Sequence, residues 1–153
     1  MATLTTTVTE SVTLNGHTYG NSRTKTFTDV TQVIQQNVII DTNEFTLYAE
    51  KDNAESTTAG EFDAEKTQYV RITNLSSSIN LLVHVDEADA AKTVILSIKP
   101  GCSMVMGTLD DGIDLDDDAD ITTPGMTDIT KITLEAVSSS VEVEYFIASQ
   151  SAV

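Results

Sequence analysis

The sequence has few of the residues that carry covalent or catalytic chemistry. Its 153 residues include one cysteine, two histidines and no tryptophan. The single thiol, Cys102, excludes an internal disulfide framework, and a zinc site would need further Cys or His residues at close spacing. We therefore expect Cys102 to be a small buried packing group, as most free thiols are.

Long apolar runs are absent as well. No stretch approaches the ~20 apolar residues that a membrane-spanning helix needs. The N-terminus has no basic region followed by an apolar run, which a secretory signal would show. The sequence therefore predicts a soluble protein that is made in the cytoplasm and has no membrane partner.

Basic residues are scarce. Eight Lys and Arg residues compare with 24 Asp and Glu residues, so the formal net charge is -16. Such a chain repels phosphate groups, which argues against a nucleic acid partner. Eleven acidic residues follow position 100, whereas only one basic residue, Lys131, does so. One end or face of the fold is therefore expected to be strongly anionic.

The residues that are abundant favour strands. Thr and Val dominate, and β-branched side chains suit a pleated sheet better than a helix. Alternation with a period of two runs through segments such as 24–28, 81–85 and 94–98, and Asn15-Gly16 and Pro100-Gly101 are turn signals. About nine or ten short strands without a helical period predict an all-β fold. An antiparallel β-sandwich is expected, of which the jelly roll is one form.

The length suits one domain, 1–153. The region 69–106 is expected at the centre of the sandwich, with its first two strands forming a hairpin closed by a loop. Segment 52–66 is rich in Ala, Glu, Ser and Thr and predicts a long connection with one helical turn. Residues 1–10 leave two alternatives open, an N-terminal arm that adds a strand to a neighbour's sheet or the first strand of the chain's own sheet.

An acidic segment provides the only candidate metal site. Carboxylates recur there at alternate positions: Asp114, Asp116, Asp118 and Asp120. This spacing suits a hard cation such as calcium. Counted from Asp114, however, the sixth position is Ala119 and the twelfth is Gly125, where a calcium-binding helix-loop-helix motif has Gly and Glu. A solvated loop is the favoured alternative, so our main prediction includes no metal and no cofactor.

Catalytic candidates have no supporting pattern. Neither His17 nor His84 lies in a motif that pairs it with a nucleophile such as Cys102, and the chain has no Gly-rich phosphate loop. The sequence therefore predicts a protein that is not an enzyme. We expect His17 in an exposed turn, His84 at an interface or a sheet edge, and Met104 and Met106 packed in the core.

Several short motifs occur in an order that resembles the small structural proteins of tailed bacteriophages, often from marine or cyanobacterial hosts. They are Val-Thr-Leu-Asn-Gly at 12–16, Tyr-Val-Arg-Ile-Thr-Asn-Leu at 69–75, a Val-rich strand at 81–85, Lys-Pro-Gly at 99–101 and a final strand at 141–148.

The resemblance implies a non-enzymatic virion component, and most of all a capsid decoration or cement protein on the capsid exterior. Its implied partner is the major capsid protein, and its implied assembly is a homo-oligomer, with a trimer favoured by local three-fold symmetry. Two alternatives remain open. One is a tail, neck or receptor-binding component of the virion, and the other is a calcium- or carbohydrate-binding β-sandwich module.

Overall fold

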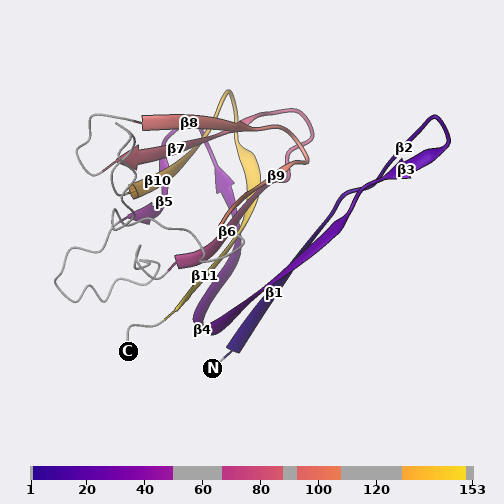
Figure 1. Ribbon diagram of the computed structural model, residues 1–153. Helices are drawn as coiled ribbons and strands as arrows, with labels where there is room; N and C mark the ends of the chain where they lie inside the picture. Colours follow the sequence, from indigo (N-terminus) through magenta and orange to yellow (C-terminus); the bar gives the residue numbers. More distant parts are fainter. Residues whose placement is uncertain (1, 50–66, 88–92, 108–128, 151–153) are drawn as a thin grey trace.

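The computed structural model describes residues 2–49, 67–87, 93–107 and 129–150 (Figure 1). These residues form eleven strands: β1 Ala2–Thr9, β2 Val12–Leu14, β3 His17–Tyr19, β4 Ser22–Ile40, β5 Phe45–Ala49, β6 Thr67–Asn74, β7 Leu81–Glu87, β8 Thr93–Ile98, β9 Ser103–Met106, β10 Ile129–Ala136 and β11 Val141–Gln150. Within these ranges, no helix is long and apolar enough to span a membrane.

Two antiparallel sheets face each other. One has the strand order β1-β4-β11-β6-β9 and the other β5-β10-β7-β8, while β2 and β3 form a separate two-stranded ribbon. The predicted all-β antiparallel sandwich is confirmed.

The pairing within the sandwich is nested. Of the eight strands from β4 to β11, the first pairs with the last (β4 with β11), the second with the seventh (β5 with β10), the third with the sixth (β6 with β9) and the fourth with the fifth (β7 with β8). The chain therefore follows the path of one long hairpin rolled into two sheets, and successive strands alternate between the sheets except for β7 and β8, which are neighbours in the four-stranded sheet.

Alternating side chains build the core between the sheets. In β6, Val70 and Ile72 are buried, whereas the residues between and beside them point to the other face. Leu81 and Val83 of β7 and Leu134 of β10 are fully buried opposite them. Full burial of a Val or Leu side chain contributes about 1.5–3 kcal/mol relative to leaving it exposed, so each member of this cluster stabilises the sandwich.

The predicted hairpin of 69–74 with 81–85 is wrong. The strands in question, β6 and β7, lie in different sheets and do not pair. The alternation of side chains specifies which face of a strand is apolar but not which strand lies beside it. The two strands are interior, as expected for the centre of the sandwich, but β8 and β9 lie at sheet edges.

Two other expectations are also corrected. Cys102 is exposed, because it lies in the turn after Pro100-Gly101 where its backbone N–H bonds to Lys99. His84 lies on β7 between β10 and β8, so a sheet-edge position is wrong. The predicted helical turn in 52–66 lies outside the described residues.

Candidate interaction site: a projecting arm and the groove beside it

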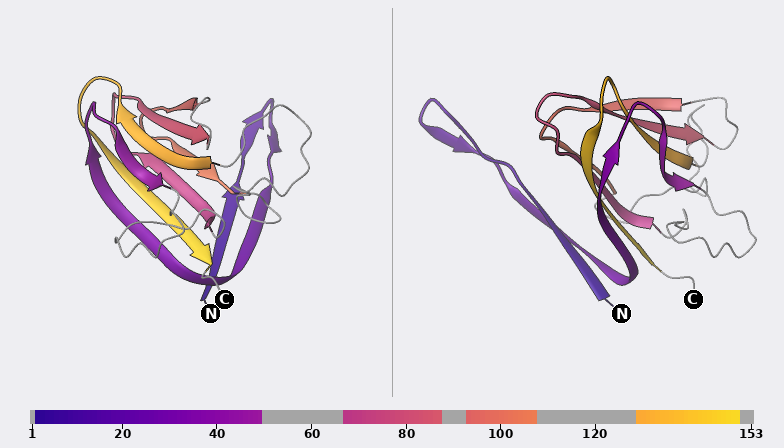
Figure 2. Two further views of the ribbon diagram at one scale, coloured as in Figure 1. Left: turned by 90° about the vertical axis from the view of Figure 1, so that its left-hand side faces the viewer. Right: turned by 180° about the vertical axis from the view of Figure 1, so that it is seen from behind.

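Residues 2–28 form a long hairpin that projects from the sandwich, and we call it the arm (Figures 1 and 2). Strand β1 pairs with the first part of β4, and β2 pairs with β3 beyond them. The end of the arm turns through Asn15 and Gly16, both with positive φ (52° and 80°), as a two-residue hairpin turn requires. The N-terminal strand therefore pairs within its own chain and is also part of a projecting structure.

A corner in β4 separates the arm from the sandwich. Asp29 has a φ of 61°, a left-handed conformation that Asp adopts more readily than most residues. Before this corner β4 pairs with β1, and after it β4 pairs with β11, where Val30 lies opposite Gln150. One continuous strand thus belongs to both the arm and the sandwich.

The arm has two different faces between its base and residue 9. On one face, hydroxyl groups pair across the strands, with Thr7 Oγ1 3.0 Å from Thr24 Oγ1 and Thr9 Oγ1 3.1 Å from Ser22 Oγ. The other face carries the cross-strand pairs Leu4 with Phe27, Thr6 with Lys25, and Val8 with Arg23. Apolar and cationic side chains are therefore segregated from the hydroxyl face.

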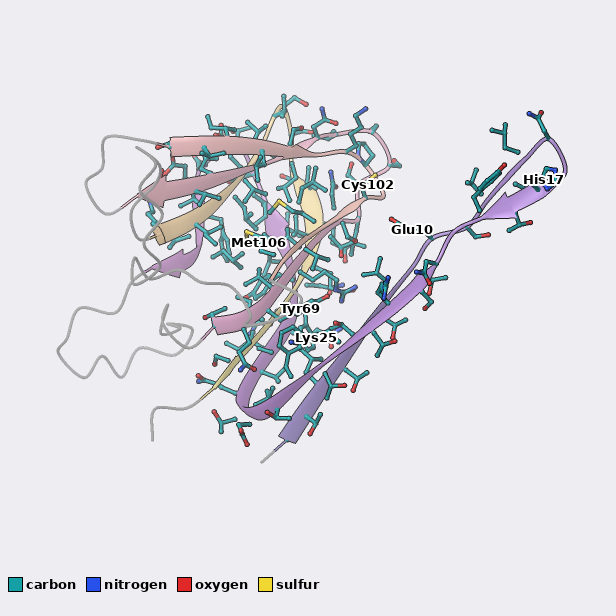
Figure 3. The ribbon with its side chains drawn as sticks, viewed as in Figure 1. Glu10, His17, Lys25, Tyr69, Cys102 and Met106 are labelled. Atoms are coloured by element: carbon teal, nitrogen blue, oxygen red, sulfur yellow. The ribbon has the colours of Figure 1, made fainter. Side chains whose placement is uncertain are left out.

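The tip of the arm is apolar and exposed. Val12, Leu14 and Tyr19 keep 58%, 60% and 55% of their surface accessible to solvent. They lie on the β2–β3 ribbon together with His17, which is exposed as expected but begins strand β3 instead of lying in the turn (Figure 3). Large exposed apolar side chains are therefore grouped at the end of a projecting hairpin.

A small second core fixes the base of the arm. Phe27, Val30 and Ala148 are buried, and the partly buried Leu4, Tyr69 and Phe146 pack against them. The Tyr69 ring lies 6.0 Å from that of Phe27 and 5.9 Å from that of Phe146, the second pair edge to face. Such aromatic pairs add about 0.5–1.5 kcal/mol beyond their buried area. We call these six residues the corner cluster, and it sets the direction of the arm.

A groove of about 700 Å³ lies between the arm and the outer face of the five-stranded sheet. Its lining residues come from both sides: Leu4, Thr5, Thr6, Thr7, Val8, Glu10, Asn21, Arg23, Lys25 and Phe27 from the arm, and Tyr69, Arg71, Val105, Gly107 and Phe146 from the sandwich. The corner cluster closes one end, and the arm diverges from the sandwich beyond it (Figure 2).

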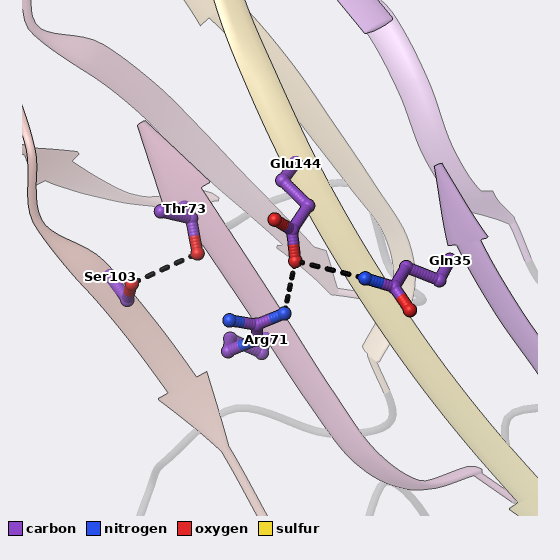
Figure 4. A network of polar contacts seen from close by, with 5 residues as sticks. All are labelled: Gln35, Arg71, Thr73, Ser103 and Glu144. Carbon is purple, nitrogen blue, oxygen red and sulfur yellow. Dashed lines mark hydrogen bonds and ion pairs between the residues drawn. The ribbon is translucent and has the colours of Figure 1, made fainter. Parts of the chain in front are cut away.

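Arg71, which lines the sandwich side of the groove, belongs to a polar network on the five-stranded sheet. Arg71 forms an ion pair with Glu144, which also accepts a hydrogen bond from Gln35 Nε2 at 3.3 Å (Figure 4). Thr73 and Ser103 pair their hydroxyl groups at 2.9 Å beside this network. On the arm side, Lys25 Nζ lies 5.8 Å from the centroid of the Phe27 ring, within the range of a cation–π contact.

The other sequence candidates are dispersed. His84 Nε2 lies 3.2 Å from Glu135 Oε2 on the four-stranded sheet, whereas His17 is at the tip of the arm. Met104 and Met106 pack against the core as expected. The calcium candidates Asp114, Asp116, Asp118 and Asp120 lie outside the described residues. Within the part of the chain that the structure describes, no group of three or more His, Cys, Asp or Glu side chains is placed to hold a metal.

The groove was not predicted from the sequence, although the alternation of side chains along one strand indicates part of its lining. Alternation along 23–27 already placed Arg23, Lys25 and Phe27 on one face of a strand. What the alternation did not show was that this face would be turned toward Tyr69 and Phe146 by the corner at residue 29.

Comparison of the chain with protein-family models, with curated proteins and with solved structures found no match. Fold and surface alone therefore define its class, an antiparallel β-sandwich that carries a projecting hairpin with an exposed apolar tip.

Proposed function

We propose that the sandwich is a jelly roll and that the protein is a non-enzymatic structural component of a tailed-phage virion, most specifically a capsid decoration protein. The nested pairing of β4 to β11 supports the jelly roll, a fold that occurs among viral capsid domains and also among lectins. Because one fold serves many functions, the fold does not support a particular function. The support for the proposed function comes from the surface of the protein.

The observation that carries it is the arm with its apolar tip. A two-stranded ribbon is marginally stable in water, and its exposed apolar residues gain free energy only when a partner covers them. Val12, Leu14 and Tyr19 are each a little more than half exposed. Covering that remainder is worth about 1 kcal/mol per residue, or about 3 kcal/mol for the tip.

A gain of that size is too small for a stable isolated contact, because association itself costs several kcal/mol. It suits a lattice, where many identical contacts act together and each bound copy holds its neighbours in place. We propose that the tip contacts the major capsid protein or a neighbouring copy, and that a trimer at local three-fold positions presents three arms. The acidic body keeps the protein soluble and away from DNA.

Counting copies per purified virion tests the assignment. Decoration predicts hundreds of copies on the exterior of the particle. A count in the tens or below would favour the tail, neck or receptor-binding alternative, and absence from virions would refute both structural roles.

A binding experiment tests the role of the tip. Threonine replaces Val12, Leu14 and Tyr19 together, which keeps strand propensity but removes the apolar surface. We expect this variant to fold normally and to lose binding to capsids that lack the protein. The matched control replaces three exposed apolar residues outside the arm, Val33, Ile39 and Val137, in the same way. Equal loss in both variants would contradict a specific role for the tip.

The calcium-binding alternative has a test of its own. If Asp114, Asp116, Asp118 and Asp120 hold calcium, added calcium raises the midpoint of thermal unfolding and a chelator reverses the change. Our proposal predicts the same midpoint in both conditions, measured by circular dichroism. A chelator-sensitive midpoint would reinstate the metal site.

A further inference from the structure

Strand β8 lies at the outer edge of the four-stranded sheet (Figure 1). It pairs with β7 along its whole length, from Thr93 with Asp86 to Ile98 with Leu81, without a bulge. Its other edge pairs with no strand among the described residues. Proteins usually block such an edge with a charge, a proline or a bulge, because its backbone N–H and C=O groups bind strands of other molecules. The segment Thr93–Ile98 has none of these three protections.

This edge strand is also apolar on both of its faces. Val94 and Leu96 lie opposite the buried Val85 and Val83, so they point to the core side, yet they keep 39% and 41% of their surface exposed. Ile95 points to the other face and is 56% exposed. A strand added beside β8 would therefore cover apolar side chains on both faces of the sheet, which favours its binding.

The residues of β8 match those of a second β8 that runs in the opposite direction. A two-fold axis through Ile95 places this residue opposite Ile95 of the second copy. It also places Val94 opposite Leu96 and Thr93 opposite Ser97. A shift by one residue would pair inward with outward side chains, and a shift by two would pair Ile95 with Thr93 or Ser97. Only the symmetric register gives all three exposed apolar residues an apolar partner.

The charges at the two ends of β8 favour the same antiparallel arrangement. The strand begins beside Asp86 and Glu87, the acidic end of β7, and it is followed by the exposed Lys99. Antiparallel pairing places Lys99 of each copy near the acidic end of the other, across about 10 Å, or two strand spacings. This attraction is compatible with the hydrogen bond that Asp86 Oδ1 accepts from Thr93 Oγ1 at 2.7 Å. Parallel pairing would instead bring like charges together.

Two other sheet edges are bounded by carboxylates. After the corner, β4 pairs with β11 on one side only, and this part of β4 lies between Asp29 and Asp41. In the sequence, β5 lies between Glu44 and Glu50. Antiparallel pairing of either strand with its own copy would bring carboxylates together at both ends, which is unfavourable in a chain of net charge -16. Strand β8 is therefore better suited to pair with a second copy than these two edges are.

We propose that β8 pairs with β8 of a second copy across a two-fold axis and joins the two four-stranded sheets into one continuous sheet. The contact is a strip about 17 Å long and about 10 Å wide, far smaller than the roughly 800 Å² per partner of a stable dimer. The dimer is therefore weak, with a dissociation constant on the order of 0.1–1 mM. The contact needs no capsid, so it goes beyond the proposed function.

Sedimentation equilibrium of the full-length protein, from about 10 µM to about 1 mM, measures the association. We expect a monomer–dimer equilibrium. Ile95→Lys places two like charges opposite each other at the axis and should raise the dissociation constant about tenfold or more. The matched control is Ile39→Lys, at an exposed isoleucine of β4, which should change the dissociation constant by less than about twofold. Circular dichroism melting curves check that both variants fold.

Disulfide trapping tests the register in a Cys102→Ser background. Oxidation should link Ile95→Cys to its own copy, because these residues lie opposite each other at the axis. Thr93→Cys should not link to itself, since the two Cα atoms are about 13 Å apart and a disulfide spans at most about 7 Å. Thr93→Cys mixed with Ser97→Cys should form the linked dimer.

Three results would overturn the assignment: a monomer at every concentration, equal weakening by Ile95→Lys and Ile39→Lys, or efficient linking of Thr93→Cys to itself. If the protein stays monomeric while Ile95→Lys lowers its binding to capsids, the edge accepts a strand of a different protein and the second copy is the wrong occupant.

Discussion

Replacing Asn74 with alanine should destabilise the whole sandwich, because its side chain joins two connections that cross between the sheets. Asn74 is fully buried. Its Nδ2 donates to the carbonyl oxygens of Ile79 at 2.8 Å and Ile98 at 3.0 Å, and its Oδ1 accepts from the backbone N–H of Ser76 at 3.0 Å. One amide thus holds the link from β6 to β7 and the end of β8.

The size of the effect follows from these bonds. A typical intramolecular hydrogen bond contributes about 1 kcal/mol, and a buried partner left unpaired costs about 1–3 kcal/mol. Losing three bonds therefore costs about 3 kcal/mol, a large share of the roughly 5–15 kcal/mol that stabilises a protein of this kind. With a urea dependence of about 1.5–2 kcal/mol per molar, the unfolding midpoint should fall by about 1.5–2 M.

Urea unfolding of Asn74→Ala, followed by far-ultraviolet circular dichroism, measures this shift. Asn80→Ala is the matched control, because Asn80 lies in the same connection but is exposed. We expect the control to stay within about 0.5 kcal/mol of the unchanged protein. A shift for Asn74→Ala below about 0.5 M, or one no larger than for Asn80→Ala, would refute the reasoning.

Three further perturbations address other parts of the fold. Burial raises the pKa of Tyr145 above its usual 10.0, so the unfolded chain loses this proton first and stability falls as pH rises above 10; Tyr145→Phe should flatten that decline in urea titrations across the range. Phe27→Ala removes the centre of the corner cluster, a change that costs about 3–5 kcal/mol in a core, and should speed trypsin cleavage after Lys25 while the sandwich stays folded. Gly16 and Gly20 both have positive φ, so alanine is strained at either position; a Cβ on Gly20 would in addition lie 1.9 Å from the Glu10 carbonyl oxygen, whereas one on Gly16 meets open space, so Gly20→Ala should disturb the amide NMR signals of the arm more widely than Gly16→Ala. Unchanged decline, unchanged cleavage or equal disturbance would contradict the respective prediction.

Strands and their inward faces could be predicted because alternation is local. Val70, Ile72 and Asn74 share one face in the sequence and are all buried in the structure. Even the polar Asn74 obeys the pattern, since the core supplies backbone partners for its amide. Pattern alone does not reveal such partners, because they come from connections distant along the chain.

Strand partners could not be predicted in the same way. A hairpin between 69–74 and 81–85 was predicted because these strands are adjacent in the sequence. In the nested pairing, however, β6 lies beside β11 and β9, whereas β7 lies beside β10 and β8. These neighbours are decided by which apolar faces cover one another across the sandwich. Similarly, no Gly or Pro marks the corner at Asp29 in the sequence. The return of the N-terminal hairpin toward Tyr69 could therefore not be predicted.

The corner cluster links the base of the arm to the proposed role of the tip, because its six residues pack the arm against the sandwich. Threonine at Val12, Leu14 and Tyr19 removes the apolar surface of the tip directly, whereas Phe27→Ala leaves that surface unchanged and loosens only the base of the arm. Both changes should therefore weaken capsid binding, although they lie at opposite ends of the arm. If Phe27→Ala bound capsids as well as the unchanged protein does, the direction of the arm would play no part in the contact.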